Sequence, residues 1–390
     1  MYEGRTVLAQ LLDHLPRHAF RRIVERYEGD VGIRSLTSWD HYVAMAFAQF
    51  TYRESLRDIE VCLRAVAPKL YHSGLRGGPV PRSTLADANE RRDWRIFAEF
   101  AQVLIADARA LYAGEPWAVE LEQTVYALDA TVIDLCRKLF PWAHFRSTKA
   151  GIKVHTLLDL AGSIPTFLWI TPAKIQDVRI LDLLFPEPGS IYVLDRGYVD
   201  FERLYRLHQA RATFVIRAKA NLRFRRRYSH PVDRTTGLIC DQTILLTTRK
   251  SAEAYPEPLR RVRYRDAKTG KKLTFLTNDF TLPALVVADL YRQRWQVELF
   301  FKWIKQHLRI KAFYGTSANA VHTQIWIAIS VYVLVAIVRK RLGIDRDLYT
   351  LLQILSITLF EKVPLAQALT APAHTLKDAH IHNQLSLFDL

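Results

Sequence analysis

Cysteine is scarce in this chain. Its three cysteines, Cys62, Cys136 and Cys240, lie far apart and form no CxxC pair. Such scattered thiols exclude a disulfide framework and a cysteine-based zinc site, because both need cysteines in paired or closely spaced groups. We therefore expect reduced thiols and a cytoplasmic location.

Long hydrophobic segments are also absent. The longest apolar run, Ile325–Val338, is interrupted by Ser330 and is shorter than the roughly 20 residues that cross a bilayer. It predicts a buried helix and no membrane association. The first residues lack a basic segment followed by an apolar block, so we expect no secretory signal peptide. No GxSxG, P-loop or dinucleotide fingerprint occurs, which excludes the enzyme classes that depend on them.

Acidic residues are outnumbered. Lys and Arg total 55 against 39 for Asp and Glu, which gives a net charge of +16. A surface of that sign favours a polyanionic partner such as DNA. With 390 residues, 49% of them hydrophobic, the chain can bury a sizeable core and is expected to form two or three folding units.

The first part of the chain, residues 1–120, has the apolar spacing of helices. Helices are expected at residues 7–15, 19–27, 39–50 and 55–66. Ser55 and Ser83 match helix caps, and the helix after Ser83 carries Arg91 and Arg92. Two interpretations are open here, a DNA-reading unit and a plain helical bundle.

From about residue 121 the pattern changes to that of a mixed α/β core. Strands are expected at residues 124–129, 153–158, 164–170, 190–195 and 213–216, and helices at residues 176–185 and 201–209. Asp129 and Asp195 each close a predicted strand at one edge of the sheet, where irregular backbone can present side chains to a substrate.

Residues 219–280 form a predicted β-rich insertion in this core. Its β segments are expected at residues 238–247 and 262–277. The insertion also carries a basic run that includes Arg225 and Arg226. One interpretation is a solvated charged surface. Because Phe224 and Tyr228 interleave with the arginines, the other interpretation is a surface that binds nucleic acid.

The stretch from residue 291 to 305 predicts a helix with one polar face. Four residues share that face within an arc of about 60°: Tyr291, Arg294, Glu298 and Lys305. Lys302 and Arg309 lie close to the arc. The opposite half is apolar and suits a core: Val297, Phe300, Phe301, Ile304 and Leu308. Taken alone, the stretch also fits a solvated helix in which Glu298 pairs with Lys302.

The spacing of these four polar residues resembles the YREK signature of DDE transposases from bacterial insertion sequences, in the insertion-sequence-four family. Asp129 is followed by Ala-Thr, and Asp195 begins the sequence Asp-Arg-Gly-Tyr, which resembles the motif around the second family aspartate. The resemblance runs from about Arg34 to Tyr332. It implies an RNase H-like core, a mixed five-stranded sheet with helices.

The resemblance also implies the chemistry. The catalytic residues would be Asp129, Asp195 and Glu298, holding two Mg²⁺ or Mn²⁺ ions, with Asp195 bridging both. Hard oxygen ligands suit these ions. Tyr291, Arg294 and Lys305 would hold DNA phosphates near the cut. Further DNA contacts are expected from Lys302, Arg225, Arg226, Arg91 and Arg92.

Other polar residues near this face are assigned lesser roles. Four rival acids lack the flanking matches: Asp134, Asp159, Asp177 and Asp200. For Lys149, Lys153 and His155, a core or surface role is the favoured interpretation. Some hairpin-forming relatives carry a tryptophan in the insertion, whereas this chain has none between Trp169 and Trp295.

The implied reaction is cut-and-paste transposition by a dimer, with cleavage at inverted repeats and transfer of the 3′-OH ends into target DNA. The alternatives are a catalytically silent DNA-binding regulator and a nuclease that does not join. The expected division places a DNA-end-binding helical domain at residues 1–120, the core at 121–218 and 281–340 around the insertion, and a helical region at 341–390.

The last residues carry a separate motif. Gln384, Leu385, Leu387 and Phe388 resemble the short peptide with which bacterial proteins bind the DNA-polymerase sliding clamp. The alternative is a tail that packs on its own domain.

Overall fold

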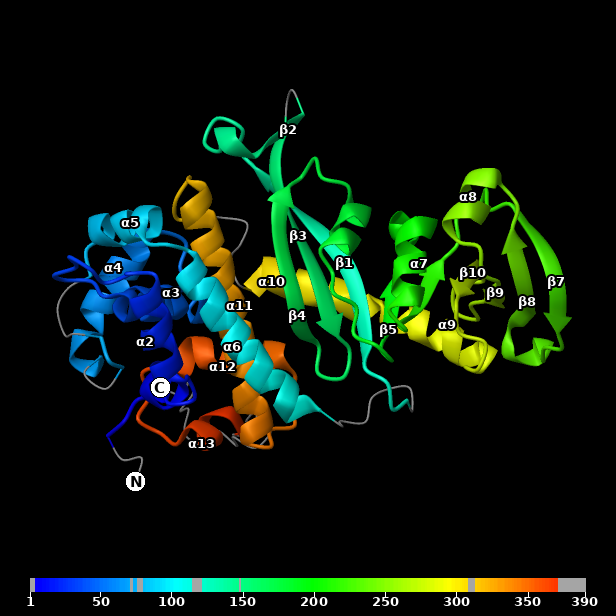
Figure 1. Ribbon diagram of the computed structural model, residues 1–390. Helices are drawn as coiled ribbons and strands as arrows, with labels where there is room; N and C mark the ends of the chain where they lie inside the picture. The colour runs from blue at the N-terminus through cyan, green and yellow to red at the C-terminus, as the bar shows by residue number, and fades with distance from the viewer. Residues whose placement is uncertain are drawn as a thin grey trace, which may run out of the picture.

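Helices from both ends of the chain form one body beside a large sheet (Figure 1). The structure is a computed structural model that describes residues 4–70, 73–75, 80–113, 121–146, 149–307 and 313–370. The helical body contains α1 (Val7–Leu12), α2 (Arg17–Arg26), α3 (Ser38–Phe50), α4 (Leu56–Ala65), α5 (Arg82–Arg91), α6 (Arg95–Tyr112), α11 (Ala318–Arg341), α12 (Leu348–Thr358) and α13 (Leu365–Thr370).

Helix α11 is the core of this body. Residues 323–338 are all buried, and the helix packs against α6 and α3. By length and composition α11 could cross a membrane, but 94% of its most apolar window is buried inside the protein, as in the core helix of a folded domain. The predicted buried helix at Ile325–Val338 is therefore confirmed.

One of the two predicted helix caps is confirmed, and the other is wrong. Ser55 accepts a hydrogen bond from the Asp58 amide at 3.2 Å and caps α4 as expected. Helix α5 begins at Arg82, directly after Pro81, with no side-chain cap. The predicted cap at Ser83 is wrong, because the helix begins one residue earlier and Ser83 lies inside its first turn.

The sheet is mixed and contains β1 (Val125–Leu135), β2 (His144–Arg146), β3 (Lys149–Asp159), β4 (Ile164–Pro172), β5 (Ile191–Leu194), β6 (Thr213–Arg217), β7 (Phe224–His230), β8 (Leu238–Leu246), β9 (Leu259–Arg265) and β10 (Lys272–Thr277). The strand order is β2-β3-β1-β5-β6-β10-β9-β8-β7, with β4 beside β3. Strand β3 pairs antiparallel with β1 and β4, whereas β5 pairs parallel with β1 and β6. The predicted mixed α/β class is confirmed.

The β-rich insertion is continuous with this sheet. Strand β10 pairs antiparallel with β6, and β9, β8 and β7 follow outward. The basic run that includes Arg225 and Arg226 forms the edge strand β7, and both side chains are exposed. A strand was not expected there, because a run of like charges carries no apolar alternation.

The two faces of the sheet pack on different helices. Val125 and Ala127 point toward the core shared with α9 (Ala284–Gln293), α10 (Trp295–His307) and α11. Tyr126 and Leu128 point to the other core, which includes side chains of α7 (Phe201–Gln209). Because side chains alternate along a strand, Asp129 continues the row of Val125 and Ala127 and faces α9 and α10.

Two predicted boundaries are wrong. Asp129 lies inside β1, since β3 pairs with β1 as far as Leu135. The expected helix at residues 176–185 is a short 3₁₀ helix, Asp177–Asp182. Pro186 disfavours helical geometry in the residue before it, and Phe185 is 92% exposed, so nothing packs a longer helix there.

Arg92 is buried, contrary to its predicted role as a DNA contact. The residue is 6% exposed. Its guanidinium donates to the carbonyl of Leu36 at 2.7 Å and to those of Thr37 and Gly29 at 3.3 Å each. Arg92 therefore holds the segment that leads into α3. Arg91, its neighbour, is exposed, and its Nη2 atom lies 3.8 Å from Asp87 Oδ1.

We expect Arg92→Met to lower the free energy of unfolding by about 2–4 kcal/mol, because buried carbonyls lose their donors. Arg91→Met is the matched control and should change stability by less than about 0.5 kcal/mol. Urea unfolding followed by circular dichroism measures both. An Arg92→Met protein of unchanged stability and weakened DNA binding would restore the DNA-contact role.

Candidate functional site

Three separate elements supply the three predicted acids. Asp129 lies in β1, Asp195 directly follows β5, and Glu298 lies in the first turn of α10. The parallel ladder between β1 and β5 ends with the pair Leu128 and Leu194. Asp129 and Asp195 are the next residues on those neighbouring strands, so the register itself brings them together.

The predicted helix at residues 291–305 is two helices that meet at Arg294. Helix α9 ends at Gln293 and α10 begins at Trp295. At the junction the Arg294 amide donates to the Tyr291 carbonyl, and the Val297 amide donates to the Arg294 carbonyl. These three-residue bonds replace the usual four-residue bonds and tighten the turn. The single continuous helix was therefore a wrong prediction.

Arg294 connects two of the acids. Its Nη1 atom donates to Asp129 Oδ2 at 2.8 Å, and its Nη2 atom donates to Glu298 Oε1 at 2.5 Å. The side chain is only 15% exposed. Glu298 thus pairs with the arginine one turn before it, rather than with Lys302, as the solvated-helix interpretation expected.

Tyr291 holds the third acid. Its hydroxyl donates to Asp195 Oδ1 at 2.9 Å, and its ring lies against Phe275 with centroids 4.7 Å apart. Burial raises the pKa of Tyr291 to about 12, so the hydroxyl keeps its proton at neutral pH and remains a donor. Tyr291 and Arg294 together contact all three carboxylates.

The carboxyl group of Asp129 has a raised pKa. Burial raises the pKa of Asp129 to about 6, and the nearby carboxylates of Glu298 and Asp195 add to the rise. The Ala130 amide, which donates to Asp129 Oδ1 at 2.8 Å, and the Arg294 guanidinium act in the opposite direction. The carboxylate is therefore costly to ionise without a cation.

The oxygen ligands in this site suit a hard divalent cation. Three carboxylates are the donor set that magnesium or manganese prefers. Within the ranges that the structure describes, no three acidic, histidine or cysteine side chains are arranged as a ready metal site. Arg294 supplies the positive charge between Asp129 and Glu298, so this position already holds a cationic group.

The rival acids have other partners. Asp177 pairs with Lys153 at 2.7 Å, and Asp200 caps α7 by accepting from the Arg203 amide. Asp159 lies 3.8 Å from Arg109. Asp134 is exposed on β1. Each of these positions has a structural or surface explanation.

Strand alternation also places Lys153 and His155 on the face away from Asp129. They fall in the row of Leu157, which belongs to the α7 core. His155 Nε2 hydrogen-bonds with the Thr171 hydroxyl at 3.0 Å. The favoured core role of His155 is thus confirmed. The side chain of Lys149 lies outside the described residues.

Sequence reasoning missed Tyr198 as part of the site. The residue is buried, and its hydroxyl has no hydrogen-bond partner among the described residues. Burial, with smaller effects of Asp129, Asp177 and Asp195, raises its pKa well above the ordinary value, so the hydroxyl keeps its proton at neutral pH. The signal was available, because Tyr198 completes the Asp-Arg-Gly-Tyr motif.

The remaining residues that are predicted to contact DNA differ in exposure. Lys302 is exposed and Lys305 is half-buried on α10, while Arg225 and Arg226 are exposed on β7. Residues Leu308 and Arg309 and the tail motif at 384–388 lie outside the described residues. The predicted apolar face of α10 is confirmed for Val297, Phe300, Phe301 and Ile304.

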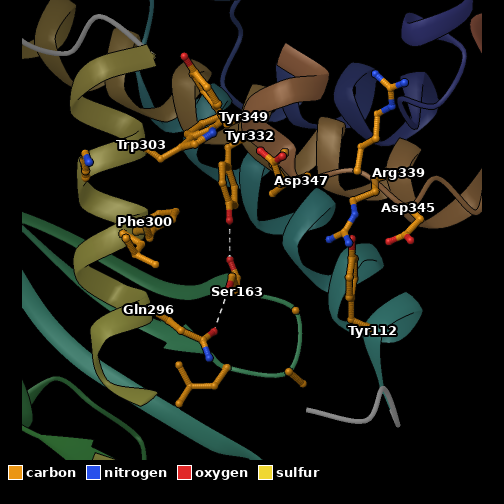
Figure 2. A pocket seen from close by; sticks show the side chains of 17 residues that line it. Tyr112, Ser163, Gln296, Phe300, Trp303, Tyr332, Arg339, Asp345, Asp347 and Tyr349 are labelled. Atoms are coloured by element: carbon orange, nitrogen blue, oxygen red, sulfur yellow. Dashed lines mark hydrogen bonds between the residues drawn. The ribbon is translucent and has the colours of Figure 1, made fainter. Parts of the chain in front are cut away.

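A cavity of about 900 Å³ is lined by another part of α10 (Figure 2). Its walls include Gln296, Trp303 and Lys302 of α10 but none of the three acids. Ser163 donates to Gln296 at 3.0 Å and accepts at its carbonyl from Tyr332 at 2.9 Å, which closes one side. A smaller cavity of about 190 Å³ reaches Tyr291 and Arg294. We place the candidate site at Asp129, Asp195 and Glu298, because Arg294 and Tyr291 contact all three of these carboxylates.

Known proteins resemble this chain over the segment that carries the three acids. The family model described as a transposase DDE domain matches residues 120–334, which include all three acids, and a domain of unknown function matches residues 3–76. The putative transposase y4zB of Sinorhizobium fredii is 34% identical over 72% of this chain and 78% of its own length.

Two further relatives carry insertion-sequence names. The probable transposase for insertion sequence element IS5377 of Geobacillus stearothermophilus is 32% identical over 53% of this chain and 54% of its own length. The putative transposase for IS4SA of Synechocystis is 24% identical over 67% and 72%. Among solved structures, a piggyBac transposase synaptic complex with hairpin DNA aligns with a TM-score of 0.44 at 11% identity, over 93% of this chain and 80% of that one.

The family match covers more than half of the chain, and a transposase relative is 34% identical over most of it. The family match spans residues 120–334 and so includes Asp129, Asp195 and Glu298. The chain therefore belongs to the DDE transposases of insertion sequences and is a DNA transposase.

Proposed function

We propose that this transposase cuts the inverted-repeat ends of its element with two divalent cations and joins the 3′-OH ends to target DNA. The observation that carries the proposal is the convergence of Asp129, Asp195 and Glu298 around one arginine and one tyrosine. Phosphodiester cleavage and strand transfer both need an activated oxygen nucleophile and a stabilised leaving oxygen, which a metal pair supplies.

The topology supports an RNase H-like core for this chemistry. Strands β4, β3 and β1 are antiparallel neighbours, and β5 and β6 continue the sheet parallel to β1. In this proposal residues 121–218 and 281–340 supply the core, and the strands of 219–280 extend it. The helices of residues 1–120 bind the element ends, and residues 341–390 complete the helical region.

The residues of the chain have distinct proposed roles. The carboxylates of Asp129, Asp195 and Glu298 would hold the cations, which would activate the nucleophilic oxygen and stabilise the leaving oxygen. Tyr291 orients Asp195 through its hydroxyl. Arg294 offers a planar fork that suits a phosphate, and Lys305 adds a point charge. These groups position the scissile phosphate and offset the charge that develops on it.

DNA is the partner in this proposal, and two copies of the chain pair the two element ends. Exposed basic residues outside the site, namely Arg225 and Arg226 on the edge strand and Arg91 and Lys302 on helices, would contact its backbone. Such contacts give affinity that falls steeply with salt. The net charge of +16 favours them.

We expect Asp129→Asn, Asp195→Asn and Glu298→Gln each to reduce cleavage by about 1,000-fold or more, because each removes a cation ligand. Asp134→Asn is the matched control, since Asp134 lies on the same strand but is exposed. Its activity should stay within about twofold of the parent protein. Cleavage is measured on labelled terminal repeats in the presence of magnesium.

The same assay, with a plasmid target added, separates the three candidate activities. A transposase yields plasmid joined to the labelled 3′ ends. A nuclease yields nicked ends alone, and a silent regulator yields only a band of shifted mobility. Absence of joined product from the folded, DNA-bound protein would contradict strand transfer.

The pKa of Asp129 predicts how metal binding responds to pH. With a pKa of about 6, about half of the Asp129 carboxyl groups hold a proton at pH 6, and a metal ion must displace it. Calorimetry with Mn²⁺ in two buffers should detect release of roughly half a proton per protein at pH 6 and almost none at pH 8. Equal proton release at both pH values would contradict this assignment.

We also propose that the tail motif of Gln384, Leu385, Leu387 and Phe388 binds the DNA-polymerase sliding clamp. The motif rests on sequence alone. A peptide of residues 380–390 should bind purified clamp in fluorescence anisotropy, and a peptide with Leu387 and Phe388 replaced by alanine should not. Equal binding of the two peptides would remove this partner.

A further inference from the structure

We infer that Arg294 holds the cation position between Asp129 and Glu298 in the metal-free protein and leaves it for a DNA phosphate when metal ions bind. The inference rests on the proposed function and adds a role to it. Arg294 acts as a positioning residue that couples metal loading to the presence of DNA.

The Arg294 guanidinium is shared between two acids. Its two terminal nitrogens donate to carboxylates on different elements, Asp129 of β1 and Glu298 of α10. A guanidinium fork commonly grips both oxygens of one carboxylate. Here it spans two acids, as a bridging ion would, and takes lone pairs that a metal ion needs.

Electrostatic repulsion between the guanidinium and a metal ion also favours this exchange. A guanidinium and a divalent cation cannot share the same oxygen atoms, because like charges a few ångströms apart repel strongly in a half-buried site. Arg294 is only 15% exposed, so water screens this repulsion poorly. Metal binding therefore requires the guanidinium to move away from both carboxylates.

Arg294 also has space beside it into which its side chain can move. It lies at the junction of α9 and α10, and its Nε atom is buried with no hydrogen-bond partner among the described residues. A cavity of about 190 Å³ lies beside it, lined also by Tyr291, Arg292 and Trp295. A phosphate in that direction would satisfy the unpaired donor and the charge together.

The consequence is reciprocal coupling. Without DNA, the displaced guanidinium has no anion to receive it, so metal ions bind weakly. With a phosphate present, the same displacement gains a new partner, and each ligand strengthens the binding of the other by the same factor. The acids are thereby kept neutralised until the DNA end arrives.

The test is calorimetric titration of Mn²⁺ into the full chain, without DNA and with a duplex that already ends at the cleavage position of the element's terminal repeat. We expect Arg294→Gln to bind Mn²⁺ at least about tenfold more tightly than the parent protein without DNA. We expect the duplex to tighten Mn²⁺ binding to the parent protein, and to change it by less than about twofold in Arg294→Gln.

Two controls separate charge at this position from other effects. Arg292→Gln removes an equal charge from an exposed neighbour that pairs with Asp289, and in the titration without DNA it should leave Mn²⁺ affinity within about twofold. Arg294→Lys keeps the charge in the site and should bind Mn²⁺ nearly as weakly as the parent protein. Circular dichroism confirms that each variant is folded.

The outcomes are distinguishable. Equal or weaker Mn²⁺ binding by folded Arg294→Gln without DNA overturns the exchange but leaves the metal-dependent function standing. If Arg294→Gln does not fold, Arg294→Lys decides, and tight Mn²⁺ binding by that variant overturns the exchange. Failure of every protein to bind Mn²⁺, with or without the duplex, overturns both the exchange and the two-cation proposal.

Discussion

The contact of Arg294 with Asp129 and Glu298 joins the sheet to the helix that completes the site. Three carboxylates gathered in a half-buried place repel one another and lose hydration, and both effects oppose folding. One guanidinium offsets part of this cost by pairing with two of the acids, and the Tyr291 hydroxyl serves the third. The break between α9 and α10 exists at the residue that makes this contact.

The sheet supplies what the helices cannot. Asp129 and Asp195 are distant in sequence, yet the parallel pairing of β1 with β5 makes them neighbours without any loop to position them. The helical body also holds α10, since α11 packs against the amino-terminal helices and its Tyr332 ring contacts Phe300 and Trp303 of α10. The arrangement of the three acids therefore depends on packing contributed by both ends of the chain.

Much of the site could be predicted because its signals are local in sequence. The strand that precedes Asp195, the apolar face of α10 and the spacing of its polar residues each fall within a few turns or one strand. The errors arose where tertiary contacts decide. Alternation does not reveal that β1 continues beyond Asp129, a helical wheel assumes a continuous helix across Arg294, and only the fold shows that Arg92 is enclosed by carbonyls of another segment.

The pairing of β10 with β6 has a mechanical consequence. The strands pair one after another from the outermost strand, where Arg225 is exposed, through β6 to β5, which Asp195 follows. Sheet hydrogen bonds resist shear, so the insertion cannot swing like a hinged flap. A twist imposed on its outer edge is transmitted across the sheet to the strand that precedes Asp195.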